Sequence, residues 1–324
     1  MAERARVVIA GASGYVGSAL HRRWANQGAL VRTIGRDADA RWSEPDAIAR
    51  ELDGADVLVN LAGASVDRRY TRAGRDTIYR SRIDTTAVLR RTLERIASPP
   101  PVWLNASTAT IYRDATDRAQ TERAGELGSG FSVDVARDWE AELFTGELPT
   151  VRRVAMRMAI VIGDGPATRM LLALARLGAG GPQLDGPWFR HDRYRGIGPH
   201  ATVAAAHSPA ARSGRQMFSW IHLDDALRAM EMLVERDDMA GPVNLVGPHP
   251  VDNPTLMRTL RTVVGAPFGL PAPRWVLEPA MWALRTEPEL VLKSRWVAPE
   301  KLRDAGFVFR YDDLDQALRA VLRG

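Results

Sequence analysis

The 324-residue chain contains no cysteine, and this absence excludes several classes of protein at once. Without thiols, the protein can form no disulfide framework, no thiolate metal site and no cysteine nucleophile. The sequence also has no run of about 18 apolar residues, and no apolar segment typical of a signal peptide precedes its first predicted strand. We therefore expect a soluble, cytoplasmic protein that does not interact with membranes.

Lysine is almost absent as well, because all but Lys293 and Lys301 of the 44 cationic residues are arginines. The formal net charge is +5, but the cationic residues are scattered instead of forming a basic tail or stripe. A surface that follows a phosphate backbone needs clustered charge, so we do not expect nucleic-acid binding. The six histidines lack the spacing of metal ligands, and we expect no metal site.

Short apolar segments alternate with helical patterns through the first half of the chain. This alternation is typical of parallel β-strands whose sheet is covered by helices on both faces. It predicts an α/β protein with a Rossmann-type, doubly wound parallel sheet. The predicted strands are 6–11, 29–35, 55–63, 101–108 and 151–163, and the predicted helices include 72–97 and 132–147.

The rhythm changes after the fifth predicted strand, where glycine- and proline-rich segments begin. We interpret residues 1–163 as a Rossmann domain to which elements near 218–247 return. Residues 164–217 and 248–324 would then form a smaller, irregular C-terminal substrate domain.

A glycine-rich motif follows the first predicted strand and opens a helix, at Gly11, Gly14 and Gly17. The first glycine permits a tight turn, the second lets the backbone approach a pyrophosphate, and the third allows close packing of helix and strand. The helix N-terminus would face the anion. We expect this loop to bind a dinucleotide through Gly11, Ser13, Gly14, Tyr15, Val16 and Gly17.

The end of the second strand distinguishes the two nicotinamide cofactors. An acidic residue there would accept a hydrogen bond from the adenosine ribose and repel a 2′-phosphate. The sequence instead has Gly35 and Arg36, and an arginine fork suits a 2′-phosphate. We therefore expect NADP(H) to be favoured over NAD(H). In the alternative, Asp37 accepts the ribose hydroxyl and Arg36 is a solvated charge.

Further motifs follow in order along the chain. They are NLAG at 60–63, STATIY at 107–112, SGRQMFSWIHLDD at 213–225 and AGFVFRYDDLDQAL at 305–318. With the glycine loop, they resemble the extended short-chain dehydrogenases/reductases. More narrowly, they resemble the NAD(P)-dependent epimerase/dehydratase subgroup that carries its own C-terminal domain of unknown function. The resemblance covers nearly the whole chain, and it implies a fold and a cofactor more directly than a substrate.

The resemblance also implies which other residues lie along the cofactor: Gly35, Arg36, Leu61, Ala62, Gly63, Thr77 and Arg82. The segment 68–82 contains six arginines and few acids. Such a cationic segment can hold the phosphates of a cofactor or a substrate, although some of its arginines would be only solvated positions on a helix.

Classical members of this family exchange protons with the substrate through a Tyr-x-x-x-Lys pair and an upstream serine or threonine. The lysine lowers the pKa of the tyrosine. Here Thr108 matches the hydroxyl residue, whereas Ser132 and Ala136 occupy the tyrosine and lysine positions. Hydride transfer assisted only by the hydroxyls of Thr108 and Ser132 is one explanation, and NADP(H) binding without turnover is another. The third is a different acid or base, for which the candidates are Tyr112, Tyr194 and His222.

The sequence predicts fewer residues that contact a substrate than residues that contact the cofactor. Trp220, His222 and Tyr194 are the expected contacts of a substrate. Asp224 or Asp225 is expected to cap the helix that follows. An insert at 183–212 is interpreted either as a lid over the substrate or as surface decoration.

Two functions remain open from the sequence. The first is an NADP(H)-dependent oxidoreductase or epimerase acting on a small polar substrate. The second is a non-catalytic NADP(H)-binding protein that reports redox state or docks a partner. The resemblance further implies a homodimer that pairs the helices 72–97 and 132–147.

Overall fold

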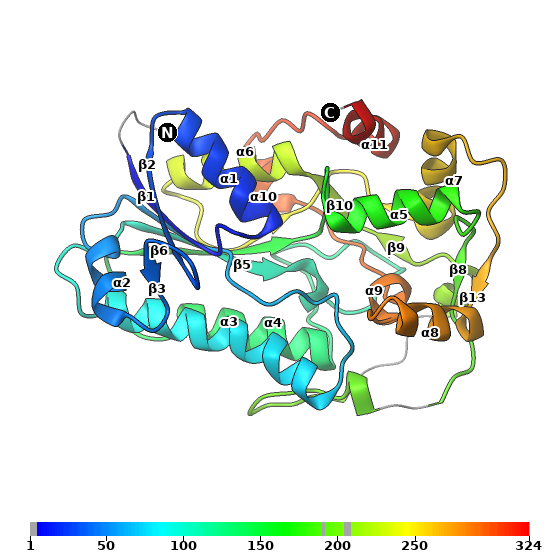
Figure 1. The fold of residues 1–324 in the computed structure, drawn as a ribbon, viewed down its shortest axis with the longest axis horizontal. Coiled ribbons are helices and arrows are strands. Elements are labelled where there is room, and N and C mark those ends of the chain that lie inside the picture. The colour runs from blue at the N-terminus through cyan, green and yellow to red at the C-terminus, as the bar shows by residue number, and fades with distance from the viewer. Residues whose placement is uncertain (1–4, 190–191, 204–208, 324) are drawn as a thin grey trace.

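The computed structural model describes residues 5–189, 192–203 and 209–323. Its central element is a seven-stranded sheet in the order β11-β6-β5-β4-β1-β2-β3, in which every pair of neighbours is parallel. This arrangement confirms the predicted doubly wound α/β fold (Figure 1). The strands are β1 (Arg6–Ala10), β2 (Leu30–Gly35), β3 (Ala40–Arg41), β4 (Val57–Asn60), β5 (Val102–Thr108), β6 (Arg152–Met158) and β11 (Gly241–Leu245).

Helices cover both faces of the sheet, as Figure 1 shows. One face packs against α1 and α6 through an apolar cluster that includes Trp24 and Leu233. The opposite face packs against α2, α3 and α4, which contribute Ile48, Leu93 and Leu143 to a second apolar cluster. The central strands are apolar on both sides because both faces are covered. These helices are α1 (Tyr15–Asn26), α2 (Pro45–Leu52), α3 (Arg72–Leu93), α4 (Phe131–Phe144) and α6 (Leu223–Glu235).

The second half of the chain adds a smaller region at one end of the sheet, on the right in Figure 1. Its core packs α5, α7 and α11 around Leu172, Leu256 and Leu318. The helices are α5 (Pro166–Arg176), α7 (Asn253–Val264), α8 (Arg274–Ala283), α9 (Glu289–Leu292) and α11 (Leu314–Arg323), whereas α10 (Glu300–Asp304) packs against β11 of the main sheet. Three two-stranded sheets pair β7 (Ile160–Ile162) with β10 (Trp220–His222), β9 (Met217–Phe218) with β12 (Val251–Asp252), and β8 (Gln183–Leu184) with β13 (Ala272–Pro273).

The structure differs from the sequence prediction at several elements. The predicted strand 151–163 is two strands, because the chain leaves the main sheet after β6 and pairs as β7 with β10. The predicted helix 72–97 ends at Leu93, and the helices α2 and α5 were not predicted. Among the residues that the structure describes, no helix is both long and apolar enough to cross a membrane.

The described part of the insert 183–212 packs against both halves of the molecule. Arg193 forms an ion pair with Glu278 of α8 at 2.5 Å. On the other side, the hydroxyl of Thr202 donates to Asp134 of α4 at 2.7 Å, and an arginine of α3 donates to backbone carbonyls of the insert. The insert therefore connects α3 and α4 with α8, which a freely projecting surface loop would not do.

Candidate cofactor and active site

The glycine motif forms a tight turn between β1 and α1. Gly11 has a φ of +84°, and a Cβ there would lie 2.7 Å from the carbonyl oxygen of Leu61 and from the nitrogen of Ala62. A Cβ on Gly17 would lie 2.3 Å from the carbonyl oxygen of Gly11. The packing of the protein itself therefore requires both glycines. The same contacts bring Leu61 and Ala62 against the glycine loop.

Gly14 differs from the other two glycines, because the protein leaves the space beside it open. A Cβ on Gly14 would meet only the carbonyl oxygen of Gly11, at an ordinary distance of 3.4 Å. Gly14 is exposed, as is Ser13, and it is the N-cap of α1 without a side-chain cap. The first N–H groups of a helix lack intrahelical acceptors and carry partial positive charge. An open surface beside such donors fits a pyrophosphate.

Tyr15 connects the glycine loop to the turn after β7. A Cβ on Gly163 would lie 2.1 Å from the hydroxyl oxygen of Tyr15, and a Cβ on Gly165 would lie 2.7 Å from its ring. The hydroxyl is buried and has no hydrogen-bond partner among the described residues. Burial raises the pKa of Tyr15 to about 12, so the phenol is protonated at neutral pH. Val16 is half-buried against the core of the sheet.

Arg36 and Arg41 carry exposed guanidinium groups at the carboxyl end of β2. Gly35 pairs in register with Arg41 of β3, so the two arginines flank one strand end. Asp39 is already paired with Arg32 at 3.0 Å. No described residue forms a hydrogen bond or ion pair with the guanidinium of Arg36 or Arg41. The strand end therefore presents two uncompensated cations, only one of which the sequence analysis identified.

Arg82 is a half-buried cation beside Gly63. Its Nη1 donates to the carbonyl of Ala64 at 3.1 Å, and its guanidinium lies 5.2 Å from the ring centre of Trp139. No carboxylate within the described ranges pairs with it, and burial lowers the pKa of Arg82 to about 10. A partly desolvated guanidinium without a carboxylate partner is suited to an anion. Thr77, by contrast, is exposed on α3, and its hydroxyl donates to a carbonyl of the same helix.

Thr108 and Ser132 lie at the carboxyl end of β5 and at the start of α4. The hydroxyl of Thr108 accepts a hydrogen bond from the N–H of Thr110 and caps the short 3₁₀ helix that follows. The hydroxyl of Ser132 donates to Oε1 of Glu289 at 2.7 Å. Ala136 is fully buried in an apolar cluster. The position of the family's lysine is therefore closed by core packing.

Charged side chains from the C-terminal region reach the end of β5 and the start of α4. The Nζ of Lys293 donates to the carbonyl of Thr110 at 2.7 Å, and Nε of Arg295 donates to the hydroxyl of Thr110 at 3.1 Å. Glu289, Lys293 and Arg295 are all buried. Burial lowers the pKa of Lys293 to about 8, against an opposing effect of Glu289. None of these residues is predicted from the sequence pattern, although the scarcity of lysine is a signal that could identify Lys293.

Tyr112 belongs to a buried hydrogen-bond network. Its hydroxyl donates to Oδ1 of Asn244 at 2.9 Å and accepts from Nη1 of Arg157 at 2.9 Å. Arg157 also forms an ion pair with Glu140 at 2.7 Å. Burial raises the pKa of Tyr112, whereas a general acid for neutral pH needs a lowered one. With its hydroxyl occupied and only 1% of its surface exposed, Tyr112 contributes to packing where the sequence suggested proton transfer.

Trp220 and His222 are also occupied by structural contacts. Trp220 is 1% exposed, and its Nε1 donates to the carbonyl of His249 at 3.1 Å. Nδ1 of His222 accepts from the N–H of Asp224 at 3.2 Å, so His222 itself is the N-cap of α6. The cap that we expected at Asp224 or Asp225 is therefore corrected to the histidine that precedes them. This arrangement assigns the imidazole proton to Nε2.

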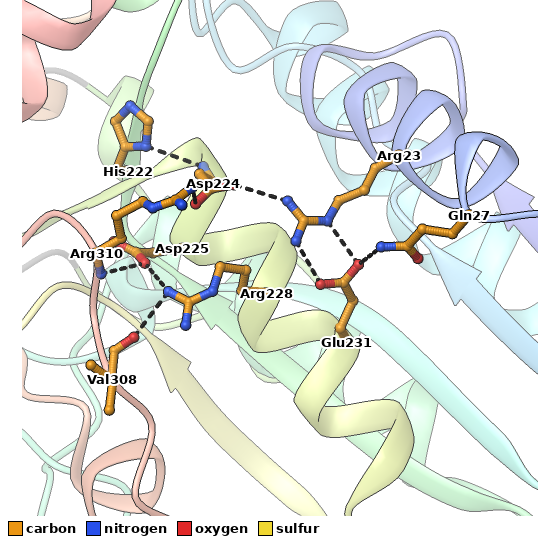
Figure 2. A network of polar contacts seen from close by, with 9 residues as sticks. All are labelled: Arg23, Gln27, His222, Asp224, Asp225, Arg228, Glu231, Val308 and Arg310. Atoms are coloured by element: carbon orange, nitrogen blue, oxygen red, sulfur yellow. Dashed lines mark hydrogen bonds and ion pairs between the residues drawn. The ribbon is translucent and has the colours of Figure 1, made fainter. Parts of the chain in front are cut away.

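The acids of α6 join three parts of the chain, as Figure 2 shows. Arg23 of α1 forms ion pairs with Glu231 at 2.7 Å and with Asp224 at 2.8 Å. Asp225 is fully buried and accepts from the backbone N–H of Arg310 at 2.8 Å. The motif at 213–225 therefore holds α6 against α1 and against the segment that leads to α11.

A pocket of about 200 Å³ lies between the loop that precedes α3 and the end of α8. Its lining is polar and aromatic, and it includes Tyr70, Arg193, Glu278 and Glu287. Tyr194 lies beside it and donates to Glu287 at 3.3 Å. Of the three expected substrate contacts, only Tyr194 is therefore near this pocket. No group of three or more potential ligands for a metal ion occurs among the described residues.

The parallel sheet, the glycine loop at the start of α1 and the cations at the end of β2 define a nucleotide-binding protein of the Rossmann type. The chain belongs to the NAD dependent epimerase/dehydratase family, whose model matches residues 7–247. A second model, for a domain of unknown function (DUF1731), matches residues 272–321. The two matches confirm the resemblance found in the sequence.

Relatives are similar over nearly their whole length. The epimerase family protein YfhF of Bacillus subtilis is 28% identical across 98% of this chain and 97% of that protein. The human epimerase family protein SDR39U1 is 25% identical across 98% of this chain and 99% of that protein. A crystal structure of human SDR39U1 (isoform 2) with NADPH superposes with a TM-score of 0.81 at 24% identity, covering 98% of this chain and 99% of that one. These similarities place the present fold among proteins named for an epimerase family.

Proposed function

We propose that the protein is an NADP(H)-dependent oxidoreductase or epimerase-like enzyme acting on a small polar substrate. The observation that carries this proposal is the pair of exposed cations, Arg36 and Arg41, at the end of β2. In Rossmann proteins this strand end meets the adenosine ribose, where an arginine accommodates a 2′-phosphate. Asp37 is exposed there as well, so a ribose-binding carboxylate is the competing assignment. A human relative that crystallised with NADPH supports the phosphorylated cofactor.

The other features of the site fit the remaining parts of a dinucleotide. Gly14 and the N-terminus of α1 would hold the pyrophosphate, and Arg82 supplies a further cation beside Gly63. A bound nicotinamide supplies or accepts a hydride. The residues of this chain would then orient the reacting carbonyl or alcohol, for which the hydroxyls at the end of β5 and the start of α4 are available.

The pocket favours a small, polar substrate. Its volume of about 200 Å³ is below the range typical of drug-sized ligands, and its lining carries the charges of Arg193, Glu278 and Glu287. Charges of both signs in one pocket suit a compound with several hydrogen-bonding groups. A second function, NADP(H) binding without turnover, is favoured by one observation: Ser132 and Ala136 leave the family's dyad unformed.

Isotope transfer separates these two functions. The protein, at a concentration comparable to that of the cofactor, is incubated with a metabolite extract and NADPH that carries deuterium on one face of the nicotinamide. The proposal predicts that mass spectrometry detects deuterium in at least one metabolite, from one cofactor face only. A Gly14→Val variant serves as the control, because its side chain would occupy the space left for the pyrophosphate. Tight NADPH binding without transfer from either face would support the non-catalytic function instead.

A further inference from the structure

The C-terminal region places a carboxylate against the residue that replaces the family's tyrosine. Oε1 of Glu289 accepts the hydrogen bond of Ser132 at 2.7 Å. Oε2 of the same carboxylate is buried and has no hydrogen-bond partner among the described residues, and the side chain is only 8% exposed. A buried carboxylate oxygen without a donor is costly. This oxygen is therefore available to a donor that arrives with a ligand.

Lys293 lies one helical turn after Glu289 and reaches the same strand end. It is 6% exposed, and its ammonium makes one hydrogen bond within the described residues, to the carbonyl of Thr110 at 2.7 Å. An ammonium carries three donors, so two of them remain unused. The charged groups that act on it are Glu289, Arg295 and Asp114.

We propose that Lys293 acts together with Glu289 as the proton-transfer residue of this site and is supplied by the C-terminal domain instead of by α4. This inference rests on the proposed hydride-transfer function. Ala136 occupies the position of the lysine in the usual dyad, and its side chain is enclosed in the core. Lys293 instead contacts the segment that follows Thr108.

The proton balance of a carbonyl reduction follows directly. The hydride from the nicotinamide adds to the carbonyl carbon, and the electron pair of the carbon–oxygen π bond moves to oxygen. The ammonium of Lys293 gives that oxygen one proton and becomes a neutral amine, which regains a proton from water. Burial lowers the pKa of Lys293 to about 8, so the transfer is accessible near neutral pH. Oε2 of Glu289 can accept a neighbouring hydroxyl of the substrate.

A purely structural role explains these groups poorly. A buried lysine with one hydrogen bond and a buried glutamate with one unpartnered oxygen both cost folding free energy, and apolar residues of similar size would often be neutral or stabilising. The nearby pocket provides a reason for their presence. Tyr70 lines that pocket, and the charges of Glu289 and Arg295 act on its hydroxyl, so Glu289 lies close to the pocket.

The first test measures the lysine without any turnover. The chain has only two lysines, so a protein labelled with ¹³C at lysine Cε gives two resonances, which a Lys301→Arg variant assigns. We expect the Lys293 resonance to titrate near pH 8, and at a lower pH in Glu289→Gln, because the carboxylate favours the charged amine. Addition of para-nitrobenzaldehyde to the NADP⁺ complex should shift this resonance and leave Lys301 unchanged.

The second test follows the oxidation of NADPH by para-nitrobenzaldehyde in a single turnover. In the parent protein the rate should fall as the pH rises above about 8, and this limb should move to lower pH in Glu289→Gln. Lys293→Met should lose about 10²–10⁴-fold in rate and the pH dependence, while its NADPH affinity is kept. Circular dichroism and thermal unfolding check that the variant is folded. Lys301→Met is the matched control and should retain the parent rate and profile.

The outcomes separate the two levels of the proposal. A Lys293→Met variant with the parent rate and pH profile would overturn the role of Lys293 and leave the proposed function intact. A parent protein that binds NADPH and shifts its Lys293 resonance with the aldehyde, yet never oxidises NADPH, would overturn the proposed function and the proton transfer that depends on it. A Lys293 resonance that does not respond to the aldehyde would overturn the placement itself.

Discussion

Two glycines of the same loop should respond to substitution in opposite ways. A Cβ on Gly17 would lie 2.3 Å from the carbonyl oxygen of Gly11, about 1 Å closer than an ordinary contact, and the obstacle is backbone. The start of α1 must therefore move, and we expect Gly17→Ala to lower the free energy of unfolding by about 1–3 kcal/mol. Gly14 has an ordinary backbone conformation and open space beside it, so Gly14→Val should cost no more than about 1 kcal/mol, the preference of an N-cap for glycine over valine.

Cofactor binding should show the complementary result. The valine side chain at position 14 would fill the space that we assign to the pyrophosphate, so NADPH should bind at least about 100-fold more weakly, or about 2.7 kcal/mol. Thermal unfolding followed by circular dichroism and NADPH titration followed by fluorescence measure the two effects on the same samples. A folded Gly14→Val protein that binds NADPH normally would refute the assignment. So would a Gly17→Ala protein as stable as the parent, because the packing argument would then be wrong.

Three further predictions concern the rest of the molecule. Burial lowers the pKa of His222, so the folded state prefers the neutral ring. The contribution of the neutral ring to stability should be complete above about pH 6.5 and should be lost as the pH falls through the pKa of the folded state. The His222→Asn variant, which keeps an N-cap, should show a smaller pH dependence in thermal unfolding scans. Arg157→Met leaves Glu140 buried without its cation and should cost about 3–5 kcal/mol in denaturant unfolding, with partial recovery when Glu140→Leu is added. We also propose a homodimer through the parts of α3 and α4 that the insert leaves uncovered; a monomer by light scattering at micromolar concentration would contradict it.

The sequence predicted the sheet and the nucleotide loop because both are encoded locally. Apolar strands separated by helices appear directly as periodicity, and the glycine spacing lies within seven residues. In the structure Gly11 forms the tight turn and Gly17 packs closely against it, as the spacing predicted. The division of the predicted strand 151–163 was not visible, because pairing with β10 depends on a strand some 60 residues away in the chain.

The reacting end of the site was predicted less well, because its groups come from distant segments. The contact between Lys293 and Thr110 spans 183 residues, and α9 has only four residues, too few to show a periodic pattern. The sequence also proposed Tyr112 as an acid, since it could not show that Arg157 on a neighbouring strand occupies the hydroxyl. Trp220 was expected beside a substrate, although pattern alone does not distinguish a pocket wall from a core position.

We expect the cations at the end of β2 to select the phosphorylated cofactor. The most direct measurement is a paired fluorescence titration of the native protein with NADPH and with NADH, repeated with Arg36→Ala and Arg41→Ala. We expect the native protein to prefer NADPH clearly, and Arg36→Ala to lose about 1–3 kcal/mol of that preference, the scale of a charge-assisted hydrogen bond, with little change in NADH affinity. Equal affinity of the native protein for both cofactors, or an Arg36→Ala variant with an unchanged preference for NADPH, would contradict the account.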